Sequence, residues 1–269
     1  MFHDWRYVSH GGTCWETPHG EACPIWGEGD LPPLRWRETD NPWGVRLRAI
    51  PAQKSEPFLR CEAPWEGVIH APTVMHRDGR YRLWYEVTQT HLMDGKQGFG
   101  NLWDLLCYAE SDDAMTWERP SLGAVRYDGD VDYNIVYGGP ATPEWGYHGG
   151  SVFHDPSAPD AERYKAFYLG TFEKHELEPY RKARPGEVDP FSLTHQCHGA
   201  VCGAVSPDGV RWTRLPEPLV IQTSDTQNIA YYDPFLEKYV GYFRMWLMGR
   251  RSIGRAETDD YRRFPLPEP

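Results

Sequence analysis

Side chains that can exchange protons or hydrogen bonds stand at the starts of three separate segments of this chain. Glu66 follows Trp65 in the first segment, His148 and Asp155 belong to the second, and Asp225 opens the third. Carboxyl and imidazole groups are the common general acids and bases of proteins. The sequence therefore offers a polar site assembled from three segments, with Glu66, Asp155 and Asp225 as candidate catalytic carboxylates.

Further residues near these positions could bind a ligand. His148-Gly149-Gly150 lets the backbone approach a ligand closely and adds an imidazole at the same point. Asp225-Thr226-Gln227-Asn228 supplies four hydrogen-bonding side chains in a row. A single histidine is more often structural, and an arginine more often forms a surface salt bridge. The candidate binding residues are Trp65, His70, His148, Gln227, Asn228 and Arg244.

The three segments belong to a repeated unit of strands. HAPTVMHRDGRYRLWYEV (70–87), GGSVFHDPSAPDAERYKAFYLG (149–170) and NIAYYDPFLEKYVGYFR (228–244) each contain an apolar strand, a polar turn and an aromatic-rich strand. A repeated hairpin of this size predicts an array of β units. The units span residues 65–136, 148–221 and 225–269, and residues 1–64 add an extended segment or closing strands, with Val45–Ile50 the best strand candidate.

Local patterns support an all-β fold, a β-propeller in one domain. Asp78-Gly79 predicts a two-residue hairpin turn, and the alternation in Arg80–Val87 predicts a half-buried strand. In SPDGVRW at 206–212, Ser and Asp would cap a tight turn and Trp would pack between neighbouring sheets. The charged insertion Glu173–Pro190 is expected to form a rim loop or short helix.

Composition narrows the class of protein. The net charge of −11 argues against nucleic acid as a partner, because a phosphate backbone needs a basic surface. No stretch approaches the length of a membrane span, and Met1–His10 shows no secretory signal. We therefore expect a cytoplasmic protein with six reduced cysteines and no membrane contact.

The motifs HAPTVMHRDGRYRLWY, VFHDPSAPDAERYK, SPDGVRW and SDTQNIAYYDP resemble those of the five-bladed β-propeller glycoside hydrolases. This superfamily holds the invertases, levansucrases and arabinanases of families 32, 43, 62 and 68, together with uncharacterised bacterial relatives. The resemblance covers roughly residues 65–265. It implies a funnel on the propeller axis in which carboxylates from different blades cleave a glycosidic bond of a carbohydrate substrate.

The resemblance gives the candidate carboxylates specific roles, and each has a structural alternative. Such enzymes need one group to protonate the leaving oxygen and a nucleophile or base at the anomeric carbon. Asp155 is similar to the transition-state-stabilising Asp of an R-D-P element, although His154 replaces the Arg. Asp233-Pro234 occupies the same position in the third repeat, between the first and second strands. Asp155-Pro156 could therefore simply be a turn. Trp65 beside Glu66 could stack on a sugar ring or belong to the core.

No cofactor is predicted, although two segments have metal-like composition. Asp128–Asn134 alternates oxygen-bearing side chains as calcium loops do, but a hairpin tip is the better interpretation. His195, Cys197, His198 and Cys202 have a zinc-like composition in a strand that would send neighbours to opposite faces.

Two functions from different classes stay open at this point. The first is hydrolysis of a glycoside, and the second is a carbohydrate-binding or scaffold propeller without activity; a sialidase-like enzyme is a weaker third. Two carboxyl groups facing each other across a pocket, about 5–10 Å apart, would favour hydrolysis. Propellers typically close with four or more blades, so about three units predict an incomplete propeller or a homo-oligomer in which a partner chain completes the ring.

Overall fold

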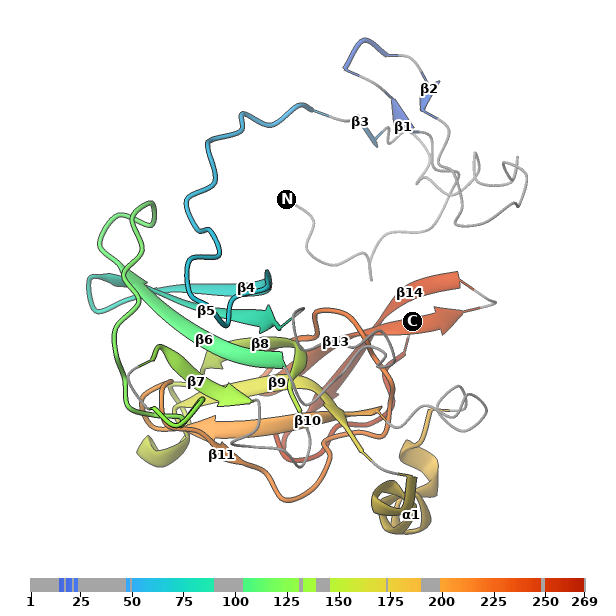
Figure 1. Cartoon of the computed structure of the whole chain (residues 1–269). Helices are drawn as coiled ribbons and strands as arrows, with labels where there is room; N and C mark the ends of the chain where they lie inside the picture. Colours follow the sequence, from blue (N-terminus) through green and yellow to red (C-terminus); the bar gives the residue numbers. More distant parts are fainter. Residues whose placement is uncertain are drawn as a thin grey trace. The chain divides into compact units, whose positions relative to one another are not determined.

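The computed structural model of the chain divides into two compact units, Met1–Glu56 and Pro57–Pro269 (Figure 1). The boundary lies inside the segment 1–64 that the sequence sets apart from the repeats. The structure describes residues 15–16, 18–20, 22–23, 47–48, 50–89, 104–130, 133–138, 146–172, 174–189, 199–247 and 250–268.

The first unit contains a small sheet with the order β2-β1-β3. Its strands are β1 (Trp15–Glu16), β2 (Ala22–Cys23) and β3 (Leu47–Arg48). β1 pairs antiparallel with β2 and parallel with β3. β3 lies within the predicted strand Val45–Ile50, and a place for residues 1–64 in a propeller stays a prediction.

The second unit contains three antiparallel sheets in which the strands follow one another in chain order. Sheet A has β4 (Val68–Arg77), β5 (Arg80–Thr88), β6 (Asp104–Ser111) and β7 (Ile135–Gly138). Sheet B has β8 (His148–His154), β9 (Tyr164–Thr171), β10 (Gly199–Ser206) and β11 (Thr213–Arg214). Sheet C has β12 (Ile229–Asp233), β13 (Lys238–Leu247) and β14 (Arg250–Thr258). The all-β fold is confirmed, and each sheet begins with the apolar strand of one sequence repeat.

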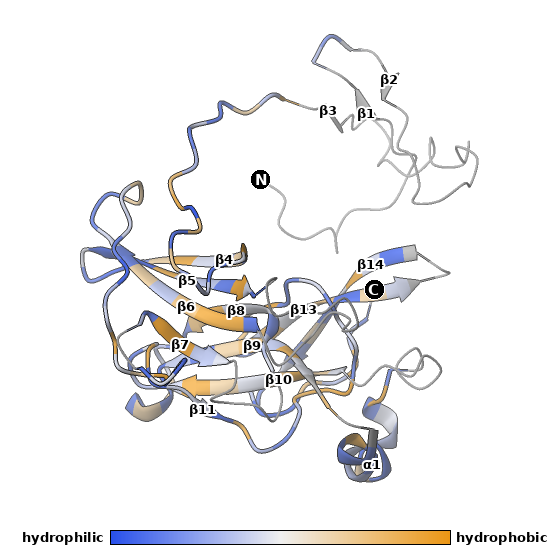
Figure 2. Ribbon diagram, in the orientation of Figure 1, coloured by the Kyte–Doolittle hydropathy of each residue, from blue (hydrophilic) through white to orange (hydrophobic). Residues whose placement is uncertain are grey.

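Short helices occur only in connections among the described residues. They are η4 (Asp160–Glu162), α1 (Lys174–Ala183) and η5 (Pro185–Glu187). α1 and η5 fall within the charged insertion, so its interpretation as a short helix is confirmed. Figure 2 shows apolar residues along strands such as β6.

The predicted turns form as expected. Asp78 and Gly79 have φ angles of 52° and 79°, and they close the β4–β5 hairpin at the Arg77–Arg80 pair. In the turn after β10, Ser206 Oγ accepts bonds from the N–H groups of Asp208 and Gly209 at 3.2 and 2.8 Å. Trp212 then packs against the apolar cluster shared by sheets A and B.

The prediction of a half-buried strand fits Arg80–Arg82 and is wrong for Leu83–Val87, where both faces of β5 are buried. Leu83, Tyr85 and Val87 pack within sheet A. Trp84, on the opposite face, is 1% exposed and belongs to a cluster that includes residues of sheet B. Its Nε1 donates to Gly209 O at 2.7 Å. Because this part of the strand packs on both sides, the face that its polar residues predicted to be exposed is buried.

The first strands of the three sheets are joined by a repeated hydrogen bond. Val152 N in β8 donates to Thr73 Oγ1 in β4, and Ala230 N in β12 donates to Ser151 Oγ in β8, both at 3.3 Å. β4, β8 and β12 therefore succeed one another as inner strands of neighbouring blades would. The described residues hold three such sheets, and closure into five blades stays a prediction.

Candidate functional site

The starts of β4 and β8 and the segment before β12 enclose a pocket of about 340 Å³, called here the histidine pocket. It is lined by His70, Ala71, His148, Gly149, Asp225, Thr226 and Gln227. Three sequence repeats thus contribute residues to one cavity.

A β-bulge in each of two strands shapes the first two walls. The register of β4 with β5 shifts between His70 and Thr73, and that of β8 with β9 shifts between His148 and Ser151. Such bulges re-aim side chains and are common next to functional sites. Ala71 and Gly149, the residues after the two histidines, have φ angles of 46° and 54°. Ala71 adopts this left-handed conformation although alanine disfavours it.

The third wall lies directly against the bulge of β8. A Cβ atom on Gly149 would lie 2.0 Å from Thr226 O, so the close approach requires glycine. Asn228 N donates to Gly149 O at 2.6 Å. The buried Asn228 side chain donates to Ser224 O and Thr226 O, both at 2.9 Å. Asn228 therefore shapes the segment that carries Asp225 and Gln227 and does not itself line the pocket.

Two buried carboxylates of sheet A lie behind His148. Glu86, in the middle of β5, has its Oε1 2.8 Å from His148 Nδ1, and its Oε2 accepts the Gly149 N–H at 2.6 Å. Asp104 Oδ2, at the start of β6, lies 3.4 Å from the same His148 nitrogen. The side chain of Glu86 is fully buried and that of Asp104 nearly so.

This arrangement shifts the protonation of both partners. Burial disfavours the imidazolium form of His148, but hydrogen bonds to Asp104 and Glu86 and their charges outweigh it and raise the pKa of His148 to about 10. Burial raises the pKa of Glu86 against the opposing effect of His148. His148 therefore keeps its proton at neutral pH, and its Nδ1 lies at hydrogen-bond distance from Glu86.

His70 approaches the same carboxylate oxygen of Glu86 as His148 does. Its Nε2 is 2.8 Å from Thr88 Oγ1 and 3.4 Å from Glu86 Oε1. The His70 and His148 rings have centroids 5.8 Å apart. Two imidazoles from different sheets thus flank one buried carboxylate at the pocket wall.

Asp225 and Gln227 complete the polar lining. Asp225 forms an ion pair with Arg244 of β13, whose guanidinium lies 5.4 Å from the centroid of the Trp246 ring. Gln227 Nε2 donates to Pro72 O at 3.2 Å, which links the third wall to the first. Arg244 therefore contributes to the site by holding Asp225 and is not part of the lining.

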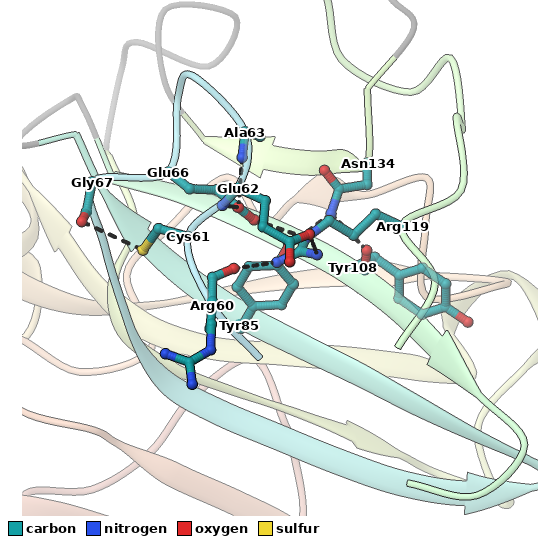
Figure 3. A network of polar contacts seen from close by, with 10 residues as sticks. All are labelled: Arg60, Cys61, Glu62, Ala63, Glu66, Gly67, Tyr85, Tyr108, Arg119 and Asn134. Carbon is teal, nitrogen blue, oxygen red and sulfur yellow. Dashed lines mark hydrogen bonds and ion pairs between the residues drawn. The ribbon is translucent and has the colours of Figure 1, made fainter. Parts of the chain in front are cut away.

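Glu66 lies in a different place, a hydrogen-bonded network on the other side of sheet A (Figure 3). Its Oε2 accepts the N–H groups of Glu62 and Ala63 at 2.8 and 3.0 Å. Its Oε1 accepts Tyr85 Oη at 2.7 Å and Arg119 Nε at 3.1 Å. The carboxylate is fully buried and holds the turn before β4, so it contributes no atom to the lining of the histidine pocket.

Trp65 also faces this side, and its indole lies against Tyr133 and Tyr127 with ring centroids 4.5 and 6.3 Å apart. The core interpretation of Trp65 fits these contacts, whereas a sugar platform in the pocket does not.

Asp155 caps the turn that follows β8. Its Oδ1 accepts the N–H groups of Ser157 and Ala158 at 2.9 and 3.2 Å. Its Oδ2 accepts Tyr239 Oη at 2.6 Å and lies 3.3 Å from Lys165 Nζ. The turn interpretation therefore describes Asp155 well, and this carboxylate too is absent from the pocket lining.

The structure thus brings His70, His148, Asp225 and Gln227 together, with Asn228 and Arg244 behind them. Glu66, Asp155 and Trp65 lie elsewhere in the second unit, and the catalytic roles given to the carboxylates stay predictions. Sequence reasoning missed Glu86 and Asp104. The signal for Glu86 was an acid inside the apolar run LWYEV, where an unpaired charge would be costly.

The structure describes one of the two segments with metal-like composition and only part of the other. Asp128 and Gly129, with φ angles of 46° and 85°, form a two-residue turn closed by two hydrogen bonds between Tyr127 and Asp130. The hairpin-tip interpretation of this segment is confirmed. His195, Cys197 and His198 lie outside the described residues, and Cys202 is buried in β10. In the described part of the chain, no helix has the length and apolar character needed to cross a membrane.

Comparisons with known proteins give distant similarities. No family model and no curated protein matches the chain. Similar solved structures include the Bombyx mori GH32 beta-fructofuranosidase BmSUC1, at 12% identity and a TM-score of 0.45, over 73% of this chain and 34% of that one. The endo-arabinase from Bacteroides thetaiotaomicron has 14% identity and a TM-score of 0.43, over 79% and 65% of the two chains.

The GH43 BlXynB protein from Bacillus licheniformis has 11% identity and a TM-score of 0.41, over 74% of this chain and 30% of that one. The chain thus spans about a third of the length of BmSUC1. Families 32 and 43 are among those that the sequence motifs resemble. At these identities and TM-scores the similarities assign neither a family nor an activity to this chain.

Proposed function

We propose that this protein binds a carbohydrate in the histidine pocket. The observation that carries the proposal is the lining itself: a carboxylate, a hydroxyl, an amide and two imidazoles converge from three sequence repeats on one cavity of about 340 Å³. Small-molecule pockets begin at about 300 Å³, so the volume suits a small ligand such as a short saccharide.

The chemistry of the lining matches that of sugar hydroxyl groups, each of which donates one hydrogen bond and accepts others. Asp225 accepts, Thr226 both donates and accepts, and Gln227 presents an amide with both functions. Ala71 and Gly149, both at φ > 0, line the cavity from two walls. A glycoside hydrolase-like fold, implied by the sequence resemblance, agrees with this class of ligand.

The test is a binding screen of the full chain against neutral and acidic mono- and oligosaccharides by isothermal titration calorimetry. Asp225→Asn should weaken binding about tenfold or more, because a hydrogen bond to a charged group contributes about 1.5–3 kcal/mol. Asp233→Asn is the matched control, since Asp233 caps a turn outside the pocket by accepting the N–H groups of Phe235 and Leu236. Equal losses in both variants, or no binding by the wild type, would count against the proposal.

Hydrolysis of a glycosidic bond is the second candidate. It is favoured by Asp225, a carboxylate that lines the pocket and is held by Arg244. Glycosidases use two acidic groups, and Asp225 is the one carboxylate among the described lining residues. A screen with aryl-glycosides tests it: turnover abolished by Asp225→Asn supports hydrolysis, and saccharide binding without turnover supports a binding protein.

A further inference from the structure

We infer that His70, Glu86 and His148 form a binding site for one divalent transition-metal ion at the wall of the histidine pocket. The three residues come from β4, β5 and β8, and thus from two sheets. Their ligating atoms, one from each side chain, all lie within 4.8 Å of one another. The inference uses protein atoms alone and is independent of the proposed carbohydrate ligand.

The spacing suits a single ion. Glu86 Oε1 lies 2.8 Å from His148 Nδ1 and 3.4 Å from His70 Nε2. Atoms that bind one zinc ion at about 2.0–2.2 Å stand roughly 3–3.6 Å apart. All three atoms lie within 4.8 Å of one another, a wider limit than this range, so an ion would draw the two imidazoles toward a common centre beside the carboxylate oxygen.

The charge around this position calls for a cation. Glu86 is fully buried, and Asp104 brings a second carboxylate oxygen to within 3.4 Å of His148 Nδ1. Buried carboxylates are stable only when paired or bound to a cation. The proton that His148 carries balances part of this charge, and a metal ion that displaces the proton would balance it in its place.

The surroundings orient the ligands as an outer shell does in metalloproteins. The Gly149 N–H holds Glu86 Oε2 at 2.6 Å, which leaves Oε1 toward the two histidines. Thr88 Oγ1, 2.8 Å from His70 Nε2, adds an oxygen beside the same position. The Gly149 contact fixes the orientation of Glu86 as outer-shell partners do, whereas Thr88 contacts the same His70 nitrogen that would bind the ion and would have to give up that hydrogen bond.

The ligand set selects the type of metal. Two imidazoles and one carboxylate are the ligands of catalytic zinc sites and of related iron sites, whereas calcium and magnesium prefer oxygen alone. His70 and His148 both line the pocket, so further coordination positions would face the cavity. Water or a ligand hydroxyl group would occupy them.

The alternative occupant of this position is the proton of the His148–Glu86 hydrogen bond. Metal binding would displace it, because a ligating imidazole nitrogen must be unprotonated. A metal titration of the full chain decides between the two, with chelator-stripped protein titrated with Zn²⁺ by calorimetry and with Co²⁺ by visible absorption. We expect one equivalent to bind, with proton release and a Co²⁺ spectrum of low symmetry.

Variants of two histidines of β4 allow a matched comparison of metal affinity. His70→Gln should weaken the one-equivalent event by at least roughly tenfold, since even outer-shell losses cost 10–100-fold. His76→Gln, which changes an exposed histidine of β4 outside the cluster, should bind as the wild type does. Glu86→Gln should also weaken binding, and circular dichroism shows whether it folds.

The half-buried His70 keeps the inference testable even if the buried Glu86 variant fails to fold. Equal affinities in the wild type, His70→Gln and His76→Gln would assign any binding to surface groups and overturn the inference. Absence of a one-equivalent event in the wild type would leave the proton as occupant and overturn it as well.

Discussion

Two adjacent residues of β5, Tyr85 and Glu86, face opposite sides of sheet A and meet very different surroundings. The Tyr85 hydroxyl bonds to Glu66, Arg119 and Asn134 at 2.7–3.2 Å, all residues of the first repeat. Glu86 bonds to His148 and to the Gly149 N–H, which belong to the second repeat. The Tyr85 side of β5 therefore makes its hydrogen bonds within the first repeat. The Glu86 side links sheet A to sheet B at the histidine pocket.

The contrast between Glu66 and Glu86 shows what distinguishes a structural carboxylate from a candidate site residue. Both side chains are fully buried in sheet A. Glu66 receives four hydrogen bonds that occupy both oxygens, two from Tyr85 and Arg119 of its own repeat and two from the residues just before that repeat. Glu86 depends on partners from another sheet that also line a cavity. Burial alone does not identify function, whereas the origin of the partners does.

The largest expected effect is on the Glu66 side. Glu66→Ala removes one member of a buried ion pair, leaves the Tyr85 hydroxyl without its acceptor and leaves Arg119 Nε with the Tyr85 oxygen alone, so stability should fall by about 3–5 kcal/mol. Metal and saccharide affinity, measured well below the unfolding transition, should not change. Urea denaturation gives the first quantity and calorimetry the second. Lost affinity in a folded variant would break the distinction between the two carboxylates.

Asp155 is a buried carboxylate between these two cases, because some of its partners lie in its own turn and one, Tyr239, belongs to sheet C. Burial favours its neutral form, but bonds from Ser157 and Tyr239 and the charge of Lys165 outweigh this and lower the pKa of Asp155. Because the folded pKa lies below the unfolded value of about 3.9, the stabilisation is present above that value. It is lost as pH falls through the folded pKa.

Asp155→Asn should therefore cost about 3 kcal/mol at pH 7, since it leaves the buried Lys165 unpaired. Its deficit relative to the wild type should shrink between about pH 4 and the lower folded pKa. Chemical denaturation at a series of pH values measures this. A deficit that is the same at pH 3 and pH 7 would contradict the assigned ionisation.

Gly149→Ala tests the other side of β5. The new Cβ would lie 2.0 Å from Thr226 O at a φ of 54°, so the loop carrying Asp225 must move. We expect a stability loss of about 1–3 kcal/mol together with a clear loss of ligand affinity. Gly129→Ala is the control: its φ is 85° and no atom lies within 4 Å, so it should cost some stability and leave binding unchanged. Equal binding by both variants would argue against a role for this wall.

Tyr85→Phe should give the smallest effect. It deletes the hydroxyl shared by Glu66, Arg119 and Asn134 while keeping the buried ring, so about 1–2 kcal/mol should be lost. Binding at the histidine pocket should be unaffected, because the neighbouring Glu86 keeps its partners. Thermal unfolding and the metal titration measure the two quantities. A changed metal affinity would show that the two faces of β5 are coupled.

The sequence predicted the parts of the fold that depend on nearby residues. The three repeats, the Asp78-Gly79 turn and the cap of Ser206 on its own loop all arise from contacts within a few residues. The pairing of Glu86 with His148 joins residues 62 positions apart. The bulge at Ala71 has no local signal, because alanine rarely takes a positive φ. Those features depend on how one sheet packs against the next, which periodicity does not reveal.

The side-chain hydrogen bonds that link β4 to β8 and β8 to β12 bear on how a further sheet could pack beside β12. Thr73 and Ser151 each accept one N–H of the following strand, from Val152 and Ala230. By the same offset the next acceptor position falls on Ile229, whose side chain has no acceptor and which is 47% exposed. The series of side-chain-to-backbone hydrogen bonds between first strands therefore ends at β12. A further sheet beside β12 would lack the side-chain hydrogen bond that joins β4 to β8 and β8 to β12, so the third repeat differs from the first two as a neighbour.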